Sequence, residues 1–148
     1  MKVEEVFQQV QRLFLDTAPV IYYVESHPKY RPVVDAIFDG IDDGRLPAVT
    51  SPITLSECLV VPYRFGDVSA QEHFADLIIR GQGVLFVVID EGIAQRAAEL
   101  RAHYNLSLTD AFQIGTALVA GCDALLTNDA TLKRVQELGV IVVDELEP

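Results

Sequence analysis

Four acidic residues of this chain occupy positions from which they could act together on a metal ion. They are Asp16, Glu57, Asp110 and Asp129. Carboxylates that converge repel one another and raise one another's pKa, and a divalent cation relieves that repulsion. A set of ligands made only of oxygen suits Mg²⁺ or Mn²⁺. If the fold brings these acids together, metal-assisted hydrolysis is a chemistry that they can support.

The elements that must position these acids alternate short apolar strands with amphipathic helices. The predicted strands are Leu13–Leu15, Pro47–Thr50, Val84–Ile89, Ala124–Leu126 and Val140–Val143. The predicted helices are Pro19–Glu25, Pro32–Asp43, Pro52–Val61, Ser69–Arg80, Glu91–His103, Thr109–Ala120 and Ala130–Leu138. Strands that are apolar at successive positions are typical of a sheet covered on both faces. This pattern predicts an α/β fold with three layers, α/β/α, and a central, mostly parallel sheet of five strands.

In an open sheet of this kind, the ligand site lies beyond the carboxyl ends of the strands. Asp16 directly follows the first predicted strand, and Asp129 follows the fourth after two residues. Asp110 lies near the start of a predicted helix. Glu57 comes within two helical turns of the second strand, a distance of about 11 Å. We therefore expect all four acids near one edge of the sheet.

Local roles explain three of these acids equally well when each is taken alone. Asp16 is suited to an Asx turn after a strand. Asp110 is suited to the first turn of a helix capped by Ser107. Asp129 is suited to the N-cap of the last predicted helix, which would end before Gly139. The joint placement of the acids favours a site over three separate local roles.

Glu57 lies among apolar residues in the segment Leu55–Val61, which contains no other charge. A carboxylate buried there would need a partner. The alternative is that Glu57 and Ser56 mark the single exposed stripe of this helix. We favour the site interpretation because the other three acids are expected at the same edge.

Composition limits the classes of protein that this chain can represent. It has 148 residues, of which 50% are hydrophobic, and we expect a single domain over residues 1–148 with a short N-terminal extension, 1–12. The formal net charge of −11 argues against broad, charge-driven binding to nucleic acids or anionic membranes. The two cysteines form no CxxC motif, and the N-terminus lacks the apolar run of a signal peptide. These features favour a soluble cytoplasmic protein without a membrane span.

Four segments together resemble the PIN domain, a metal-dependent nuclease fold that includes the VapC toxins of toxin–antitoxin pairs. They are Asp16–Thr17 after a strand, the apolar helix with Glu57, the stretch Asp110–Leu118, and Thr127–Asp129. The resemblance covers residues 13–143, and it implies that the four acids are catalytic and ligate one or two Mg²⁺ or Mn²⁺ ions. Thr17, Thr127 and Asn128 would orient those ligands through hydrogen bonds.

The resemblance further implies a ribonuclease that leaves a 5′-phosphate and a 3′-hydroxyl, and that acts as the toxin of a type II toxin–antitoxin pair. The implied partners are an RNA substrate, an antitoxin protein and a second copy of the chain in a homodimer. We expect the antitoxin in a groove between the helices Pro32–Asp43 and Pro52–Arg64. The residues considered for RNA contacts are Lys133, Arg134, Arg64 and Tyr63, of which the tyrosine could stack on a base.

Two features depart from the family pattern: a dozen residues precede the first strand, and Leu132 stands where an aromatic residue is frequent. Competing enzyme classes lack their motifs. A haloacid-dehalogenase-type phosphatase needs an acid where this chain has Ala18, a receiver domain needs a lysine after the fourth strand, and no GxxxxGK or GxGxxG motif occurs. His27, His73 and His103 show no shared spacing. The remaining alternative is a PIN-like binding or scaffold module with little or no hydrolysis.

Overall fold

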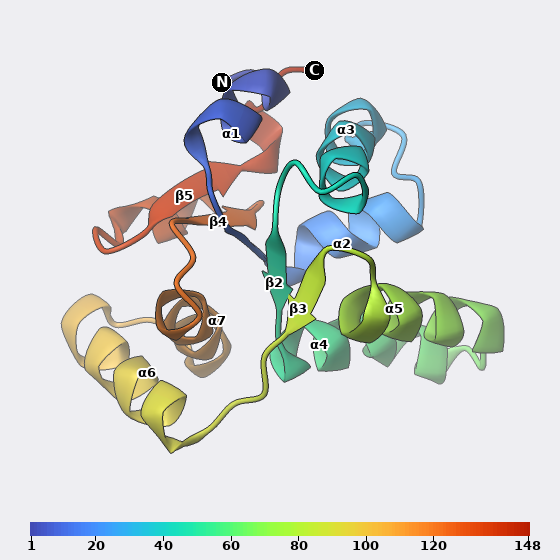
Figure 1. Cartoon of the computed structure of the whole chain (residues 1–148). Coiled ribbons are helices and arrows are strands. Elements are labelled where there is room, and N and C mark those ends of the chain that lie inside the picture. Colours follow the sequence, from blue (N-terminus) through green and yellow to red (C-terminus); the bar gives the residue numbers. More distant parts are fainter.

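The computed structural model covers residues 1–148 and contains one parallel sheet with helices on both faces (Figure 1). The strands are β1 (Leu13–Leu15), β2 (Ala48–Thr50), β3 (Val84–Phe86), β4 (Ala124–Thr127) and β5 (Gly139–Val142). Their order in the sheet is β3-β2-β1-β4-β5, and every neighbouring pair is parallel. The predicted three-layer α/β/α fold is confirmed, and the sheet is parallel throughout.

The register of the sheet determines which residues meet at its carboxyl edge. Leu13 of β1 pairs with Ala48 of β2 on one side and with Ala124 of β4 on the other. Leu15, the last residue of β1, pairs with Leu126. The residues that follow β1 and β4 therefore emerge side by side from the centre of the sheet.

Seven α-helices and two 3₁₀ helices connect and cover the strands. They are α1 (Val3–Gln9), α2 (Thr17–Val24), α3 (Arg31–Asp42), α4 (Pro52–Arg64), α5 (Val68–Arg80), α6 (Glu91–Tyr104), α7 (Leu108–Val119), η1 (Ala130–Arg134) and η2 (Val143–Glu145). Ser51 caps α4 by accepting hydrogen bonds from the amides of Ile53 and Thr54. None of the helices combines the length and the hydropathy that a membrane-spanning segment requires.

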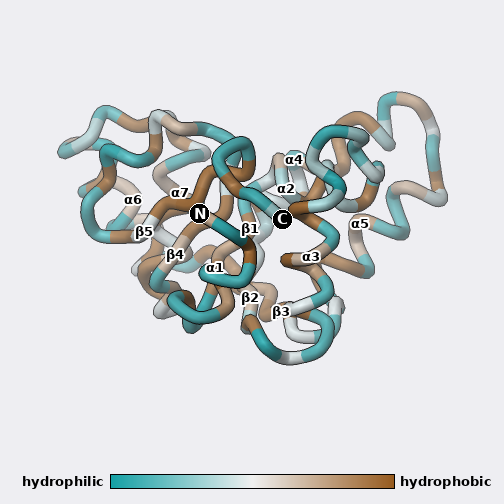
Figure 2. The backbone as a smooth tube through the Cα atoms, turned by 90° about the horizontal axis from the view of Figure 1, so that it is seen from above, coloured by the Kyte–Doolittle hydropathy of each residue, from teal (hydrophilic) through white to brown (hydrophobic).

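The two faces of the sheet pack against different helices, which Figure 2 shows on opposite sides of the molecule. Leu13 and Leu15 belong to a core cluster that includes residues of α1 to α5. Phe14, between them, belongs to a second cluster with residues of α6, α7 and η1. Alternate residues of a strand point to opposite faces, so both faces of β1 need apolar side chains. This explains the unbroken apolar run that predicted a buried strand.

Residues 1–12 contain a helix that joins the core. Val3 and Val6 of α1 are buried. The amide of Val3 donates a hydrogen bond to the carbonyl oxygen of Glu147, and the amide of Glu147 donates one to the carbonyl oxygen of Met1. The N-terminal segment is therefore tied to the C-terminal residues.

Two predicted elements were too long. The helix expected over Ala130–Leu138 ends at Arg134 as η1, and Gly139 begins β5 instead of capping a helix. Because β5 lies parallel beside β4, the chain must travel back along the sheet, and extended residues cover about twice the distance of helical ones. The strand expected over Val84–Ile89 ends at Phe86, because its only neighbour, β2, ends at Thr50.

Candidate active site

Asp16 lies at the centre of the carboxyl edge of the sheet, between β1 and α2. Its backbone amide donates to the carbonyl oxygen of Leu126 in β4, 3.0 Å away. Its side chain forms no capping bond with α2, so the Asx-turn interpretation finds no support. Instead Oδ2 accepts a hydrogen bond from the Thr127 hydroxyl at 2.8 Å. Strand pairing and the hydroxyl together hold this carboxylate toward the end of β4.

The pKa of Asp16 is raised above its ordinary value. Burial is the largest cause, because it removes the solvent that stabilises the charge. The hydrogen bond from Thr127 acts in the opposite direction, and the negative charge of Glu57 raises the pKa further. Asp16 is thus a carboxylate whose ionised form a nearby cation would stabilise.

Asp110 lies in the first turn of α7, and its backbone amide donates to the Ser107 hydroxyl that caps this helix. The local role predicted for this pair is therefore present. The side chain is half-buried, and burial is the largest cause that raises its pKa. The charges of Asp16 and Asp129 raise it further, whereas that of Arg134 lowers it. Asp110 therefore responds electrostatically to two other acids of the predicted set.

Asp129 is an exposed residue that caps η1. Its Oδ1 accepts hydrogen bonds from the backbone amide of Thr131 at 3.0 Å and from the Thr131 hydroxyl at 2.6 Å. Its own amide donates to Thr127 Oγ1 at 3.1 Å. The predicted capping role is present, and it coexists with the charge coupling to Asp110.

Glu57 is exposed on the second turn of α4, as is Ser56 beside it. The exposed-stripe interpretation is thus correct as to solvent contact, and Glu57 is not the buried carboxylate considered above. Its Oε1 nevertheless accepts a hydrogen bond from the Thr17 hydroxyl at 2.7 Å, and its charge raises the pKa of Asp16. Thr17 follows Asp16 directly, so the bond draws the carboxylate of Glu57 toward the sheet edge.

The four acids form a chain of neighbours and not a closed metal cage. No group of three or more His, Cys, Asp and Glu side chains lies close enough together to hold a metal ion. The charges of the acids nevertheless affect one another: Glu57 raises the pKa of Asp16, and both Asp16 and Asp129 raise the pKa of Asp110. These carboxylates carry like charges that disfavour one another, and oxygen ligands of this kind are the ones that Mg²⁺ and Mn²⁺ prefer.

The predicted hydrogen-bonding residues divide into two kinds. Thr127 and Thr17 contact acids of the set, Asp16 and Glu57 respectively. Asn128 contacts none of these acids, because its side chain forms hydrogen bonds with Tyr22 and with the backbone amide of Asp144.

Gln113 is a site residue that sequence reasoning left unassigned. It is almost fully buried in α7, and its Nε2 donates to Thr54 Oγ1 at 2.8 Å and lies 3.4 Å from Asp16 Oδ1. Its Oε1 accepts from Ser51 Oγ at 2.5 Å. Gln113 therefore joins α7 to the start of α4 and to Asp16. One feature of the sequence could have pointed to Gln113: it is a polar residue between Phe112 and Ile114 in a predicted amphipathic helix.

The predicted RNA-contact residues lie in different surroundings. Lys133 pairs with Glu145, whereas Arg134 donates to the carbonyl oxygens of Thr131 and Tyr104 and influences Asp110. Tyr63 and Arg64 are exposed at the end of α4. His27, His73 and His103 belong to no group of side chains that could hold a metal ion.

Comparisons with known proteins agree with this fold. The family model of the PIN domain matches residues 13–138. Among solved structures, VapBC2 from Rickettsia felis bound to a DNA fragment from the promoter matches with a TM-score of 0.64 and 17% identity, over 89% of this chain and 98% of that one. A toxin–antitoxin complex from Klebsiella pneumoniae matches with a TM-score of 0.65 and 21% identity, over 88% and 97%.

A third similar structure is Mycobacterium tuberculosis VapC20, a toxin that cleaves the sarcin–ricin loop. It has a TM-score of 0.63 and 15% identity, over 76% of this chain and 86% of that one. Comparison with curated proteins finds no significant match. Because the family model spans most of the chain, including all four acids, this protein belongs to the PIN domain family.

Proposed function

We propose that this protein is a Mg²⁺- or Mn²⁺-dependent endoribonuclease and the toxin of a type II toxin–antitoxin pair. The observation that carries the proposal is the mutual effect of like charges at the carboxyl edge of the sheet: Glu57 raises the pKa of Asp16, and Asp16 and Asp129 raise that of Asp110. The chain belongs to a family that includes nucleases, and this supports a role of these carboxylates in hydrolysis.

Asp16, Glu57, Asp110 and Asp129 would hold one or two divalent ions. When bound, such ions lower the pKa of water and stabilise charge on the scissile phosphate. Thr127 restrains the carboxylate of Asp16 through its hydroxyl. Glu57, anchored by Thr17, remains open to solvent and serves either as a ligand or as the group that orients the attacking water.

RNA is the proposed substrate, and Arg134 is the side chain best suited to meet its backbone. The guanidinium pairs with no carboxylate, and its charge lowers the pKa of Asp110. Lys133 is less suited because Glu145 already pairs with it. One structurally similar protein, the toxin from Mycobacterium tuberculosis, cleaves an RNA loop, which supports this substrate class.

An antitoxin and a second copy of the chain are the proposed protein partners. Two of the similar structures are toxin–antitoxin complexes. Exposed apolar side chains around the end of α4 and the start of α5 would suit a partner protein: Val60, Val61, Tyr63, Phe65 and Val68. We propose that the protein acts in the cytoplasm, where it would encounter both RNA and the antitoxin.

A binding module without hydrolysis is the second candidate. It is favoured by one observation, that no three acidic side chains lie close enough to hold a metal ion. The two candidates differ in whether the acids bind Mn²⁺ and whether RNA is cleaved.

Incubation with structured RNAs and Mg²⁺ or Mn²⁺ separates these candidates. We expect Asp16→Asn and Asp110→Asn to lower the cleavage rate at least about a hundredfold, since each removes a charge needed in the transition state. Asp67→Asn is the matched control, because Asp67 caps α5 and its charge does not contribute to the pKa of Asp16 or Asp110, and asparagine caps equally well. Calorimetry should show Mn²⁺ binding that Asp16→Asn weakens. Cleavage by all four proteins at the same rate would exclude this site.

A further inference from the structure

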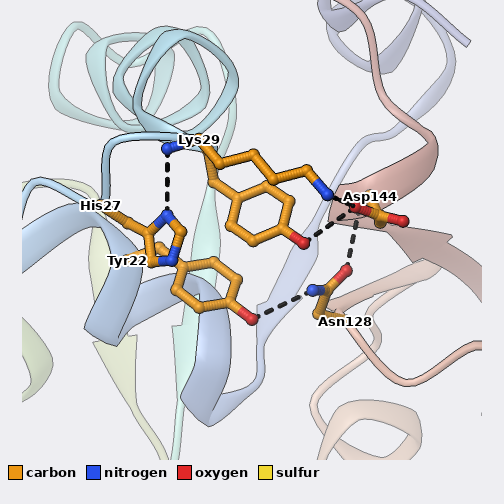
Figure 3. A network of polar contacts seen from close by, with 6 residues as sticks. Tyr22, His27, Lys29, Asn128 and Asp144 are labelled. Carbon is orange, nitrogen blue, oxygen red and sulfur yellow. Dashed lines mark hydrogen bonds and ion pairs between the residues drawn. The ribbon is translucent and has the colours of Figure 1, made fainter.

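A polar cluster joins the turn after β4 to α2 and to the segment between α2 and α3 (Figure 3). Its members come from three parts of the chain that are far apart in sequence. They are Tyr22, His27, Lys29, Tyr30, Asn128 and Asp144. None of the hydrogen bonds within the cluster is made by the four acids, so their chemistry alone does not explain it.

Asn128 is the residue through which this cluster meets the site. Its Nδ2 donates to the Tyr22 hydroxyl at 3.0 Å, and its Oδ1 accepts from the backbone amide of Asp144 at 2.9 Å. Its two sequence neighbours belong to the site: Thr127 donates to Asp16, and the amide of Asp129 donates to Thr127 Oγ1. The side chain of Asn128 thus anchors the backbone between two site residues without contacting an acid.

The remaining members restrain the two partners of Asn128. The ring of Tyr22 stacks on that of Tyr30 with centroids 4.5 Å apart, and His27 packs at 5.0 Å from Tyr22. The Tyr30 hydroxyl donates to Asp144 Oδ1 at 2.8 Å, and Lys29 pairs with the same oxygen at 3.0 Å. The aromatic stack therefore limits where the Tyr22 hydroxyl can lie, which makes it a rigid acceptor for Asn128.

We propose that Tyr22 is a positioning residue that acts through Asn128 to hold the turn Thr127–Asp129 in the geometry the site requires. The proposal rests on the ribonuclease function above, because its purpose is to orient the Thr127 hydroxyl and the Asp129 carboxylate. It adds a residue on α2 that contacts none of the four acids. A purely local turn would need no partner so distant in sequence.

Tyr22→Phe tests this role, because it removes one hydroxyl and leaves the ring to stack on Tyr30. Tyr23→Phe is the matched control: Tyr23 is the next residue of α2, its ring stacks on Phe38, and its hydroxyl forms no hydrogen bond. Steady-state RNA cleavage gives kcat and KM. Hydrogen exchange of the Asp129 and Asp144 amides in the metal-free protein reports on the turn itself.

For Tyr22→Phe we expect kcat to fall about tenfold or more, since a displacement near 1 Å in a catalytic group can cost ~100-fold. KM should change less than about twofold, and both amides should exchange several-fold faster, because local opening becomes easier. Asn128→Ala should have a larger effect, and adding Tyr22→Phe to it should change little, because both act through one bond. Tyr23→Phe should match the wild type in every measurement.

The role is excluded if Tyr22→Phe retains wild-type kcat and amide exchange. It is also excluded if the two tyrosine variants lose activity and melting temperature to the same degree, since that indicates general packing. Asp16→Asn, measured in parallel, separates the two levels of the proposal. Full cleavage by Asp16→Asn refutes the assigned active site, whereas loss there with a fully active Tyr22→Phe refutes only the positioning role.

Discussion

At the residue scale, Gln113 shows how much of the site depends on a group that is not an acid. Its amide has both ends engaged in a buried network, with Ser51 on one side and Thr54 on the other. A buried hydroxyl that loses its partner costs about 1–3 kcal/mol. The positions of Asp16 and of the start of α4 are therefore coupled through one side chain.

Gln113→Leu is predicted to lower both stability and activity. Leucine has a similar volume but leaves Ser51 and Thr54 without their side-chain partners, so we expect a loss of about 2–3 kcal/mol in the free energy of unfolding. Cleavage at saturating RNA should also fall, because Asp16 loses its neighbour at 3.4 Å. Urea unfolding and single-turnover kinetics measure the two effects.

Thr116→Val is the control for this prediction. Thr116 is buried in the same helix, and its hydroxyl donates only to the carbonyl oxygen of Phe112 within α7. We expect it to cost no more than about 1 kcal/mol and to leave cleavage unchanged. Equal losses from both substitutions would show that Gln113 contributes only as a buried helix residue.

The sequence predicted where two of the acids lie but not the partners of the polar residues around them. The positions of Asp16 and Asp129 at the sheet edge could be predicted because each follows an apolar strand, and parallel strands end at one edge. The partners of Gln113 and Asn128 could not be predicted, because Thr54 lies 59 positions from Gln113 and Tyr22 lies 106 positions from Asn128. The direction in which Asn128 points depends on how α2 packs, which no local pattern encodes.

At the element scale, the strands and most helices followed their apolar periodicity, whereas α1 and the first two residues of α2 were not predicted. β1 could be predicted to the residue, because both of its faces are buried. The last predicted helix was wrong beyond Arg134, because the chain had to return to begin β5. Pairing between strands is a property of the whole sheet, and it prevailed over the helical pattern there.

The turn from α5 into β3 requires glycine at position 83. Gly83 has a φ of +77°, and a Cβ added there would overlap the carbonyl oxygen of Ile41 at the end of α3. Gly44 has a similar φ of +88° but open space around it. Substitutions at Gly44 and Gly83 therefore share the cost of backbone strain, and only the one at Gly83 adds steric overlap.

We predict that Gly83→Ala is much more destabilising than Gly44→Ala. Both substitutions place alanine in the left-handed region, which costs about 1–2 kcal/mol. Only the first must also displace backbone of α3, so we expect its loss in the free energy of unfolding to exceed that of Gly44→Ala by about 2 kcal/mol or more. Denaturant midpoints of the two variants measure this difference. Equal midpoints would show that the turn relaxes without cost.

At the scale of the whole molecule, the net charge of −11 leaves little positive surface for RNA. Six of the eleven basic side chains pair with carboxylates: Lys29, Arg31, Arg45, Arg80, Arg96 and Lys133. Of the others, Arg134 carries a charge that lowers the pKa of Asp110. RNA affinity should therefore depend on few phosphate contacts.

This charge distribution predicts a shallow dependence of RNA binding on salt. Each phosphate contact to a single strand contributes about −0.7 to the slope of log K against log salt, so a protein with one or two contacts should show a slope near −1. Arg134→Ala should make this slope less steep by about 0.7, whereas Arg80→Ala should leave it unchanged, because Arg80 lies at the end of α5 and pairs with Asp76. Fluorescence anisotropy with the cleavage-deficient Asp16→Asn background measures the slopes at fixed Mn²⁺. A steep slope that Arg134→Ala leaves unaltered would show that RNA binds a different face of the molecule.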